Sequence, residues 1–179
     1  MAEPLLPLIV EPAELEAALG ADGLLIVDLN APGLYAEGHV PGAVNLAFGA
    51  LIGPRPPAMG TIPSAEQLSS ALSSIGLTRD HHVVAYDTEG TAKASRFLWT
   101  LDVVGHPNAS LLNGGFHSWG GEGHPRETEA NFPAPSDYSV TIGDTALAGK
   151  DYILERLDDD NVVVLDCRTP AEYSGDDMR

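Results

Sequence analysis

The stretch LLIVDLNAPGLYAEGHVPGA, residues 24–43, decides the fold class. It opens with the continuous apolar run Leu24-Leu25-Ile26-Val27, which is typical of a strand that is buried on both faces of a sheet. Asp28 ends the run, and Gly38 and the pair Pro41-Gly42 are typical turn residues. Because a strand that is apolar on both sides needs cover above and below, the stretch favours a parallel α/β sheet.

The sequence around this stretch alternates between helices and strands. Residues 83–86 predict a second buried strand, and residues 109–112 predict a third strand. The predicted helices cover residues 12–19, 64–76 and 92–104, the second opening on the capping box Ser64-Ala65-Glu66-Gln67. Strands separated by helices form βα units, so the predicted fold class is α/β, an open parallel sheet flanked by helices. Residues 49–63 predict a long surface loop that is rich in Gly and Pro.

Composition narrows the class of protein. The chain has 179 residues, with 9 Lys and Arg against 26 Asp and Glu, which gives a formal charge of −17. Such a charge repels phosphate backbones and anionic membrane surfaces, so neither nucleic acid nor membrane is an expected partner. No apolar run approaches the roughly 18 residues that span a bilayer, and the N-terminus has no basic segment like that of a signal peptide. These features predict a cytoplasmic protein.

Part of the sequence occurs twice. Residues 27–38 return in altered form at 165–175, with Asp28 and Tyr35 matched by Asp166 and Tyr173, each 138 residues later. The first copy continues for about another hundred residues, whereas the second stops at the end of the chain. We therefore expect a complete domain over residues 5–122, a linker over 123–139 that is rich in Gly, Pro and acidic residues, and the incomplete start of a second domain over 140–179.

Four collinear segments resemble the rhodanese family, specifically its tandem-domain thiosulfate and 3-mercaptopyruvate sulfurtransferases. The segments are Val27-Asp28 with Tyr35 and residues 38–45, residues 83–87, residues 94–101 with Gly105, and residues 111–116 with Trp119. The resemblance implies a rhodanese-like open parallel sheet and an incomplete second repeat. It also implies the transfer of a sulfane sulfur from a small anionic donor, thiosulfate or 3-mercaptopyruvate, through a cysteine persulfide to cyanide or a thiol. The resemblance implies no metal and no organic cofactor.

The position of the family's nucleophile is occupied by Asp87 in the first repeat. In the family, a cysteine follows a strand and precedes a helix N-terminus, where backbone amides and the helix dipole stabilise a thiolate. Asp87 cannot carry a persulfide, and with Glu89 it would repel an anionic donor. We therefore assign no catalytic residue to the first repeat and expect the nucleophilic cysteine beyond Arg179. A cysteine placed at position 87 is expected to keep an ordinary thiol pKa of about 8.5, since the loop offers no cation.

Other conspicuous residues of the first repeat are assigned structural roles. The carboxylate of Asp28, at the end of a buried strand, is expected to accept backbone N–H groups of the following turn. His39 is expected to be a hydrogen-bonded loop histidine, and Gly42 a turn residue. The pair His81-His82 predicts a solvated bend.

The second repeat supplies the one candidate for substrate binding. By resemblance to the Asp-x-Arg of catalytic repeats, Arg168 would help to hold the anionic substrate, while Asp166 belongs to the structural signature. The first repeat has Asn30 at the position that matches Arg168, which agrees with a repeat that binds no anion. Cys167 is expected to be a buried, inert thiol, because it stands at the variable position of this signature.

Two functions compete. The chain resembles the N-terminal part of a thiosulfate sulfurtransferase, whose activity would need residues that follow Arg179. The alternative is a non-catalytic rhodanese-like module that binds a partner or regulates. In either case residues 162–165 predict a strand that is apolar on both faces, and without neighbouring strands it could promote self-association.

Overall fold

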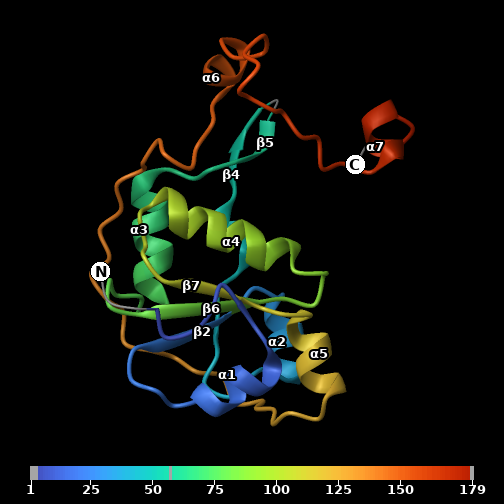
Figure 1. Ribbon diagram of the computed structural model, residues 1–179. Coiled ribbons are helices and arrows are strands. Elements are labelled where there is room, and N and C mark those ends of the chain that lie inside the picture. The colour runs from blue at the N-terminus through green and yellow to red at the C-terminus, as the bar shows by residue number, and fades with distance from the viewer. Residues whose placement is uncertain (1–3, 57, 178–179) are drawn as a thin grey trace. The chain divides into compact units, whose positions relative to one another are not determined.

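The computed structural model describes residues 4–56 and 58–177, which form two compact units (Figure 1). The first unit ends at Ala146 and the second begins at Leu147. The elements of the first unit are β1 (Ile9–Val10), α1 (Pro12–Ala18), β2 (Leu24–Asp28), α2 (Pro32–Glu37), β3 (Val44–Asn45), the 3-10 helix η1 (Phe48–Leu51), β4 (Gly53–Arg55), β5 (Ala58–Thr61), α3 (Ala65–Ser74), β6 (His82–Tyr86), α4 (Ala92–Val103), β7 (Ala109–Leu112) and α5 (Gly115–Gly121). The second unit contains α6 (Lys150–Leu154) and α7 (Pro170–Ser174).

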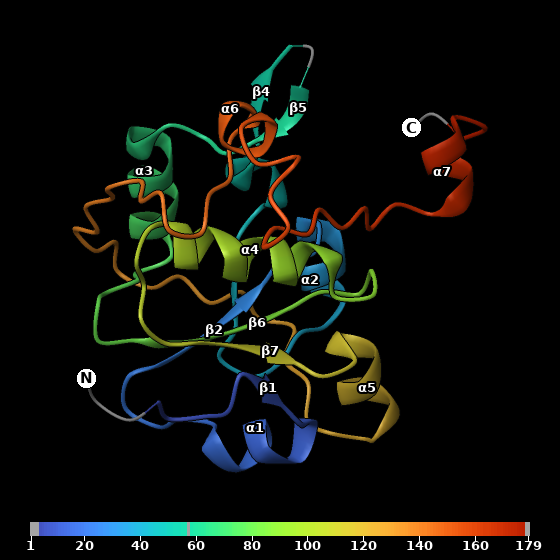
Figure 2. The same ribbon diagram turned by 45° about the horizontal axis from the view of Figure 1, so that its top comes forward.

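A five-stranded parallel sheet organises the first unit. Its strand order is β1-β7-β6-β2-β3, and every neighbouring pair is parallel, as the sequence predicts. Helices α3 and α4 cover one face, while α1 and α5 lie on the other (Figures 1 and 2). The sheet is therefore covered on both faces, which explains why its inner strands are mostly apolar. Their polar residues Asp28, His82 and Ser110 are buried and hydrogen-bonded.

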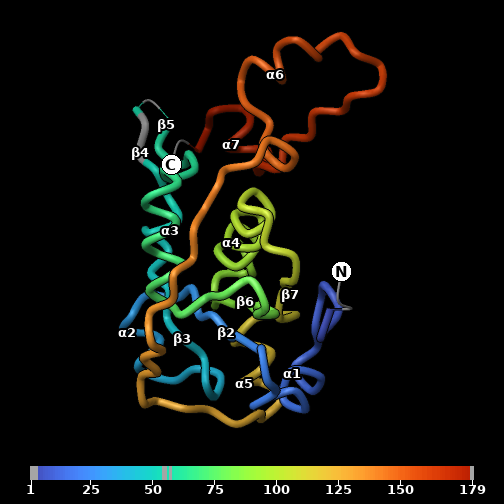
Figure 3. Tube along the Cα trace, turned by 90° about the vertical axis from the view of Figure 1, so that its left-hand side faces the viewer, coloured from blue at the N-terminus to red at the C-terminus, as the bar shows by residue number. Residues whose placement is uncertain are grey.

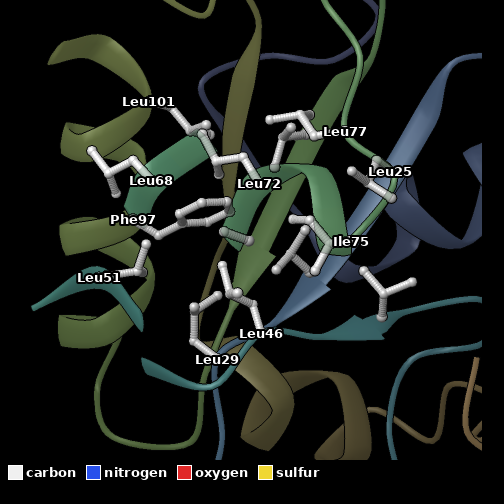
Figure 4. Packing of buried hydrophobic residues seen from close by; sticks show 14 of the residues in the cluster. Leu25, Leu29, Leu46, Leu51, Leu68, Leu72, Ile75, Leu77, Phe97 and Leu101 are labelled. Atoms are coloured by element: carbon white, nitrogen blue, oxygen red, sulfur yellow. The ribbon is translucent and has the colours of Figure 1, made fainter. Parts of the chain in front are cut away.

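Alternate residues of each inner strand feed two separate cores. In β2, Leu25 and Val27 belong to the cluster under α3 and α4, whereas Ile26 belongs to the cluster with α1 and α5. Figure 4 shows the larger cluster, in which leucines of α3 and the sheet surround the buried ring of Phe97. Each core residue of this kind contributes roughly 1.5–3 kcal/mol on burial, so the two clusters fix the sheet between its helix layers.

Most predicted helices and strands are present, with three differences. The loop expected over residues 49–63 contains η1 and the antiparallel hairpin of β4 and β5. His82 does not lie in a solvated bend: it is buried in β6, where its Nε2 lies 2.7 Å from Oγ of Ser110. Residues 162–165 form no strand, and Val163 and Leu165 are 78% and 79% exposed. A strand requires hydrogen-bonded neighbours, and the described part of the second unit offers none.

The segment expected to be a linker is instead packed along the first unit. Residues 123–146, which we call the strap, run beside α3 in extended conformation (Figure 3). Their backbone amides bond α3, with Tyr138 and Val140 donating to the hydroxyls of Ser73 and Ser69, both at 3.0 Å. The boundary between the units therefore lies after Ala146.

Tyr138 is the side chain that holds the strap most firmly. It is 2% exposed, and its hydroxyl lies 3.0 Å from Nδ1 of His106, a buried residue whose pKa burial lowers. The guanidinium carbon of Arg79 stands 4.4 Å from the centre of the Tyr138 ring. This aromatic contact adds to the antiparallel bridge between Glu127 and His39, which pairs the start of the strap with the first unit.

This packing predicts where a protease cuts first. Limited trypsin digestion should cleave at Lys150, Arg156 and Arg168 before Arg126, because the backbone around Arg126 is held by the strap's hydrogen bonds. Mass spectrometry should find a resistant fragment that ends at Lys150. Digestion in concentrated urea is the control, since all four sites should then be cut. An early cut at Arg126 in the native chain would show that the strap is a free linker.

Candidate functional site

The site lies at the carboxyl edge of the sheet, between the two central strands. After β2 the chain passes through α2 to β3 on one side of the central pair of strands, whereas after β6 it passes through α4 to β7 on the other side. The loops that follow neighbouring parallel strands therefore separate at this point. Such a divergence is where open α/β sheets usually bind ligands.

Asp87 follows β6 directly and is buried, with 1% of its surface exposed. Its Oδ1 accepts the backbone amides of Glu89 and Thr91 at 2.7 and 2.9 Å, and its Oδ2 accepts that of Ala94 at 2.9 Å. The last of these amides belongs to the first turn of α4, where the helix dipole also favours a negative charge. The loop is thus a cradle for an anion, and the carboxylate of Asp87 fills it.

Two glycines and a threonine allow the loop to close in this way. Gly90 and Thr91 both adopt the left-handed backbone region, with φ of 71° and 70°. On the other side, the carbonyl of Asp87 accepts the amide of Phe116 at 3.0 Å. A Cβ on Gly115 would overlap that carbonyl oxygen, so only glycine fits there.

Asn30 ties the end of β2 to the same loop. Its Oδ1 accepts the amide of Thr88 at 2.9 Å and the hydroxyl of Thr88 at 2.7 Å. Asn30 is 2% exposed and forms one wall of a cleft of about 470 Å³, whose other walls include Leu34 of α2 and Phe116 of α5. A cleft therefore opens immediately beside the loop of Asp87.

The residues of the structural signature lie beneath this cleft. Oδ1 of Asp28 accepts the amide of Asn30 at 2.7 Å, and burial raises the pKa of Asp28. The hydroxyl of Tyr86, whose pKa burial also raises, accepts the amide of Val40 at 3.1 Å. These bonds hold the turn after β2 and the turn before β3 against the central strand.

His39 and Gly42 belong to the second of these turns. His39 is completely buried; its Nδ1 lies 2.8 Å from the carbonyl of Tyr35, and its ring stacks on the Tyr35 ring with centroids 3.8 Å apart. Gly42 adopts a φ of 77°, and its amide donates to Glu127 of the strap at 2.7 Å. Neither residue reaches the cleft.

Asp166 and Arg168 lie in the second unit and are paired with each other. Nη2 of Arg168 lies 2.6 Å from Oδ2 of Asp166, and this contact holds the pKa of Asp166 at about 2. The amide of Arg168 donates to Oδ1 of Asp166 at 3.0 Å, which repeats the Asp28–Asn30 turn of the first unit. Cys167 between them is exposed, so the expectation of a buried thiol is wrong: the segment around it, residues 163–168, is exposed to solvent.

Two features of the site could not be predicted from the sequence. The spacing of residues does not reveal that the Asp87 carboxylate would reach three amides at once, because that depends on the backbone conformation of the loop. Arg126 also lines the cleft, although it falls in the segment expected to be a linker. Among the described residues no group of three His, Cys, Asp or Glu side chains is placed to hold a metal ion, and none of the described helices is both long and apolar enough to cross a membrane.

Comparisons with known proteins identify this architecture. Residues 11–122 match the family model of the rhodanese-like domain. The chain is 40% identical over 171 residues to a thiosulfate sulfurtransferase of Azotobacter vinelandii and 36% identical over 170 residues to one of Pseudomonas aeruginosa. These alignments cover 96% and 95% of this chain but 63% of each relative, so the chain spans less than two thirds of the length of these relatives.

A solved structure shows the same fold. The crystal structure of SseA from Escherichia coli, a 3-mercaptopyruvate sulfotransferase with the rhodanese fold, superposes with a TM-score of 0.85 at 23% identity. The superposition covers 96% of this chain and 70% of that one. The likeness confirms the open parallel sheet flanked by helices.

The three hydrogen bonds to the Asp87 carboxylate should contribute to the stability of the folded protein. Asp87→Asn puts an amide donor where a carboxylate oxygen now accepts a backbone amide, so the free energy of unfolding should fall by about 1–3 kcal/mol. Urea denaturation measures it. Glu89→Gln is the matched control, because it makes the same change in an exposed acid of the same loop and should alter stability by less than about 0.5 kcal/mol. Equal effects of the two substitutions would contradict the assignment.

The same three amides change what is expected of a cysteine at position 87. In Asp87→Cys the sulfur would stand close to where the carboxylate carbon now lies, within reach of donors that stabilise a thiolate. The thiol pKa should therefore fall below the ordinary 8.5, contrary to the expectation from sequence. The rate of alkylation by iodoacetamide as a function of pH measures it. A pKa of 8.5 or above would show that the amides turn away once the carboxylate is gone.

Proposed function

The chain belongs to the rhodanese family, and we propose that it is the N-terminal part of a thiosulfate sulfurtransferase. In this proposal the first unit is a non-catalytic repeat and residues 140–179 open a second, catalytic repeat. The whole protein would move a sulfane sulfur from thiosulfate or 3-mercaptopyruvate to a cysteine and then to cyanide or a thiol. Its nucleophile would lie beyond Arg179, and it would act in the cytoplasm without metal or organic cofactor.

The observation that carries this proposal is the occupied cradle of Asp87. A sulfurtransferase of this type needs a thiolate, and later a persulfide, at the point where the loop amides converge. In the first unit these amides are already bonded to a carboxylate that cannot accept sulfur. The chemistry of the family would therefore have to take place in another repeat.

Features of the second unit support such a repeat. The turn from Asp166 to Arg168 has the same hydrogen bond as the turn from Asp28 to Asn30. In both units a helix with proline in its first turn follows, α2 in the first and α7 in the second, and α7 opens on a complete capping box between Thr169 and Glu172. Where Asn30 offers an amide, Arg168 offers a guanidinium, which we propose helps to hold the anionic donor.

The proposal includes self-association of the chain as it stands. Residues 163–165 are exposed and apolar, with 60–79% of each side chain accessible. Unpaired backbone groups beside such side chains favour pairing with a second copy. The alternative function, a non-catalytic module that binds a partner or regulates, requires the first unit to act without a cysteine-bearing repeat.

Enzyme assays on two lengths of chain test the proposal. The 179-residue chain should form thiocyanate from thiosulfate and cyanide only at background rate, and Cys167→Ser should leave that rate unchanged. The chain extended through its downstream reading frame should turn over, and replacing the cysteine near position 225, 138 residues after Asp87, should abolish turnover. Activity of the short chain that is lost in Cys167→Ser would overturn the proposal, as would an extended chain that has no such cysteine.

A further inference from the structure

The geometry points to a binding site for a small tetrahedral oxyanion, of the sulfate and thiosulfate class, in the cleft beside the Asp87 loop, with Arg126 as its anchor. The site is separate from the loop, because the amides of the loop are already bonded to Asp87. It lies wholly within the first unit, and no part of it depends on residues beyond Arg179.

Arg126 is held in position by packing rather than by an acid. Its guanidinium carbon lies 5.2 Å from the centre of the Phe116 ring, a cation–π contact. A Cβ on Gly120 would overlap Nη2 of Arg126, so the guanidinium rests directly on the backbone of α5. The aliphatic part of the side chain passes over Gly38, where an added Cβ would lie 4.0 Å from Cδ.

The guanidinium so placed has no acceptor within the described part of the chain. No carboxylate lies within ion-pair distance of it, and no carbonyl accepts from it. This is unexpected in a chain in which 26 acids face 9 bases. A guanidinium presents paired N–H donors that match two oxygens of an oxyanion. Arg126 is exposed and lines a cleft of about 470 Å³.

Asn30 supplies a second donor to the same cleft. Both hydrogen bonds to Thr88 use its Oδ1, which fixes the orientation of the amide and leaves Nδ2 without an acceptor in the described residues. Asn30 is 2% exposed and its surface faces the same cleft as Arg126. A buried, oriented amide donor and a positioned cation in one cleft form a site for an anion, contrary to the expectation from sequence that this repeat binds none.

Glu37 is the group that opposes an anion here. It lines the same cleft from the end of α2 and is exposed to solvent, where water and salt screen its charge. The ligand must therefore be small enough to reach Arg126 and Asn30 without contacting Glu37. This favours a compact inorganic oxyanion over a longer dicarboxylate.

NMR titration of the full 179-residue chain tests the site with sodium sulfate and sodium thiosulfate at constant ionic strength. The Nε–Hε signal of Arg126 and the side-chain amide of Asn30 should shift in a saturable manner with either salt. Sodium chloride should produce no saturable shift. Absence of saturation with both oxyanions would overturn the proposal, and this outcome is independent of whether the longer protein is a sulfurtransferase.

Four variants distinguish specific anion binding at this site from nonspecific attraction between the anion and positive charges of the protein. Arg126→Gln should weaken binding about tenfold, and Gly120→Ala should weaken it several-fold with no change in net charge, because the new methyl displaces the guanidinium. Glu37→Gln should strengthen binding about twofold, since it removes the opposing charge. Lys93→Gln, the matched control, removes a cation that is paired with Glu89 and should change the affinity by less than about twofold. Equal weakening in Lys93→Gln and Arg126→Gln, or no effect of Gly120→Ala, would contradict the assignment.

Discussion

The carboxylate of Asp87, which accepts three backbone amides of its own loop, is the interaction on which the rest of the site depends. It fixes Thr91 and Gly90 in their left-handed conformations, starts α4 at Ala92, and places Thr88 where Asn30 can bond it. The backbone carbonyl of Asp87 lies directly against Gly115, the residue at which α5 begins. The carboxylate of Asp87 therefore fixes the ends of strands β2 and β6 and the starts of helices α4 and α5 relative to one another.

This interaction also underlies our proposal that the first repeat is non-catalytic. Amides that converge at a helix N-terminus stabilise negative charge, whether the charge is a thiolate, a persulfide or a carboxylate. A carboxylate of the chain satisfies them permanently and cannot exchange. The backbone amides of the loop still converge as they would around a bound anion. Because Asp87 occupies them, any external anion must be bound by groups outside the loop.

The sequence predicts the fold more completely than it predicts the site. The runs at 24–27, 83–86 and 109–112 identify the inner strands because burial on both faces leaves them almost entirely apolar, with Ser110 as the exception in the third. The strap could not be predicted, since its Pro, Gly and acidic residues are those of a free linker. Its attachment depends on the buried ring of Tyr138 and on hydrogen bonds to residues that are distant in the sequence. The sequence predicts an exposed His82 because a histidine before a strand usually faces solvent, whereas in the structure this ring is buried and lies 2.7 Å from the hydroxyl of Ser110 on the next strand. Position 87 could be identified from its place in the repeat, but the reach of its carboxylate depends on backbone angles that the sequence does not specify.

Amide hydrogen exchange of the loop tests this account most directly. The N–H groups of Glu89, Thr91 and Ala94 should be protected in the native chain, although Glu89 and Thr91 precede α4, and the protection of Glu89 and Thr91 should be lost selectively in Asp87→Ala while β6 remains protected. That result would show that the carboxylate holds the loop. Rapid exchange of these amides in the unsubstituted chain, or protection that survives in Asp87→Ala, would show that the cradle is not filled by Asp87.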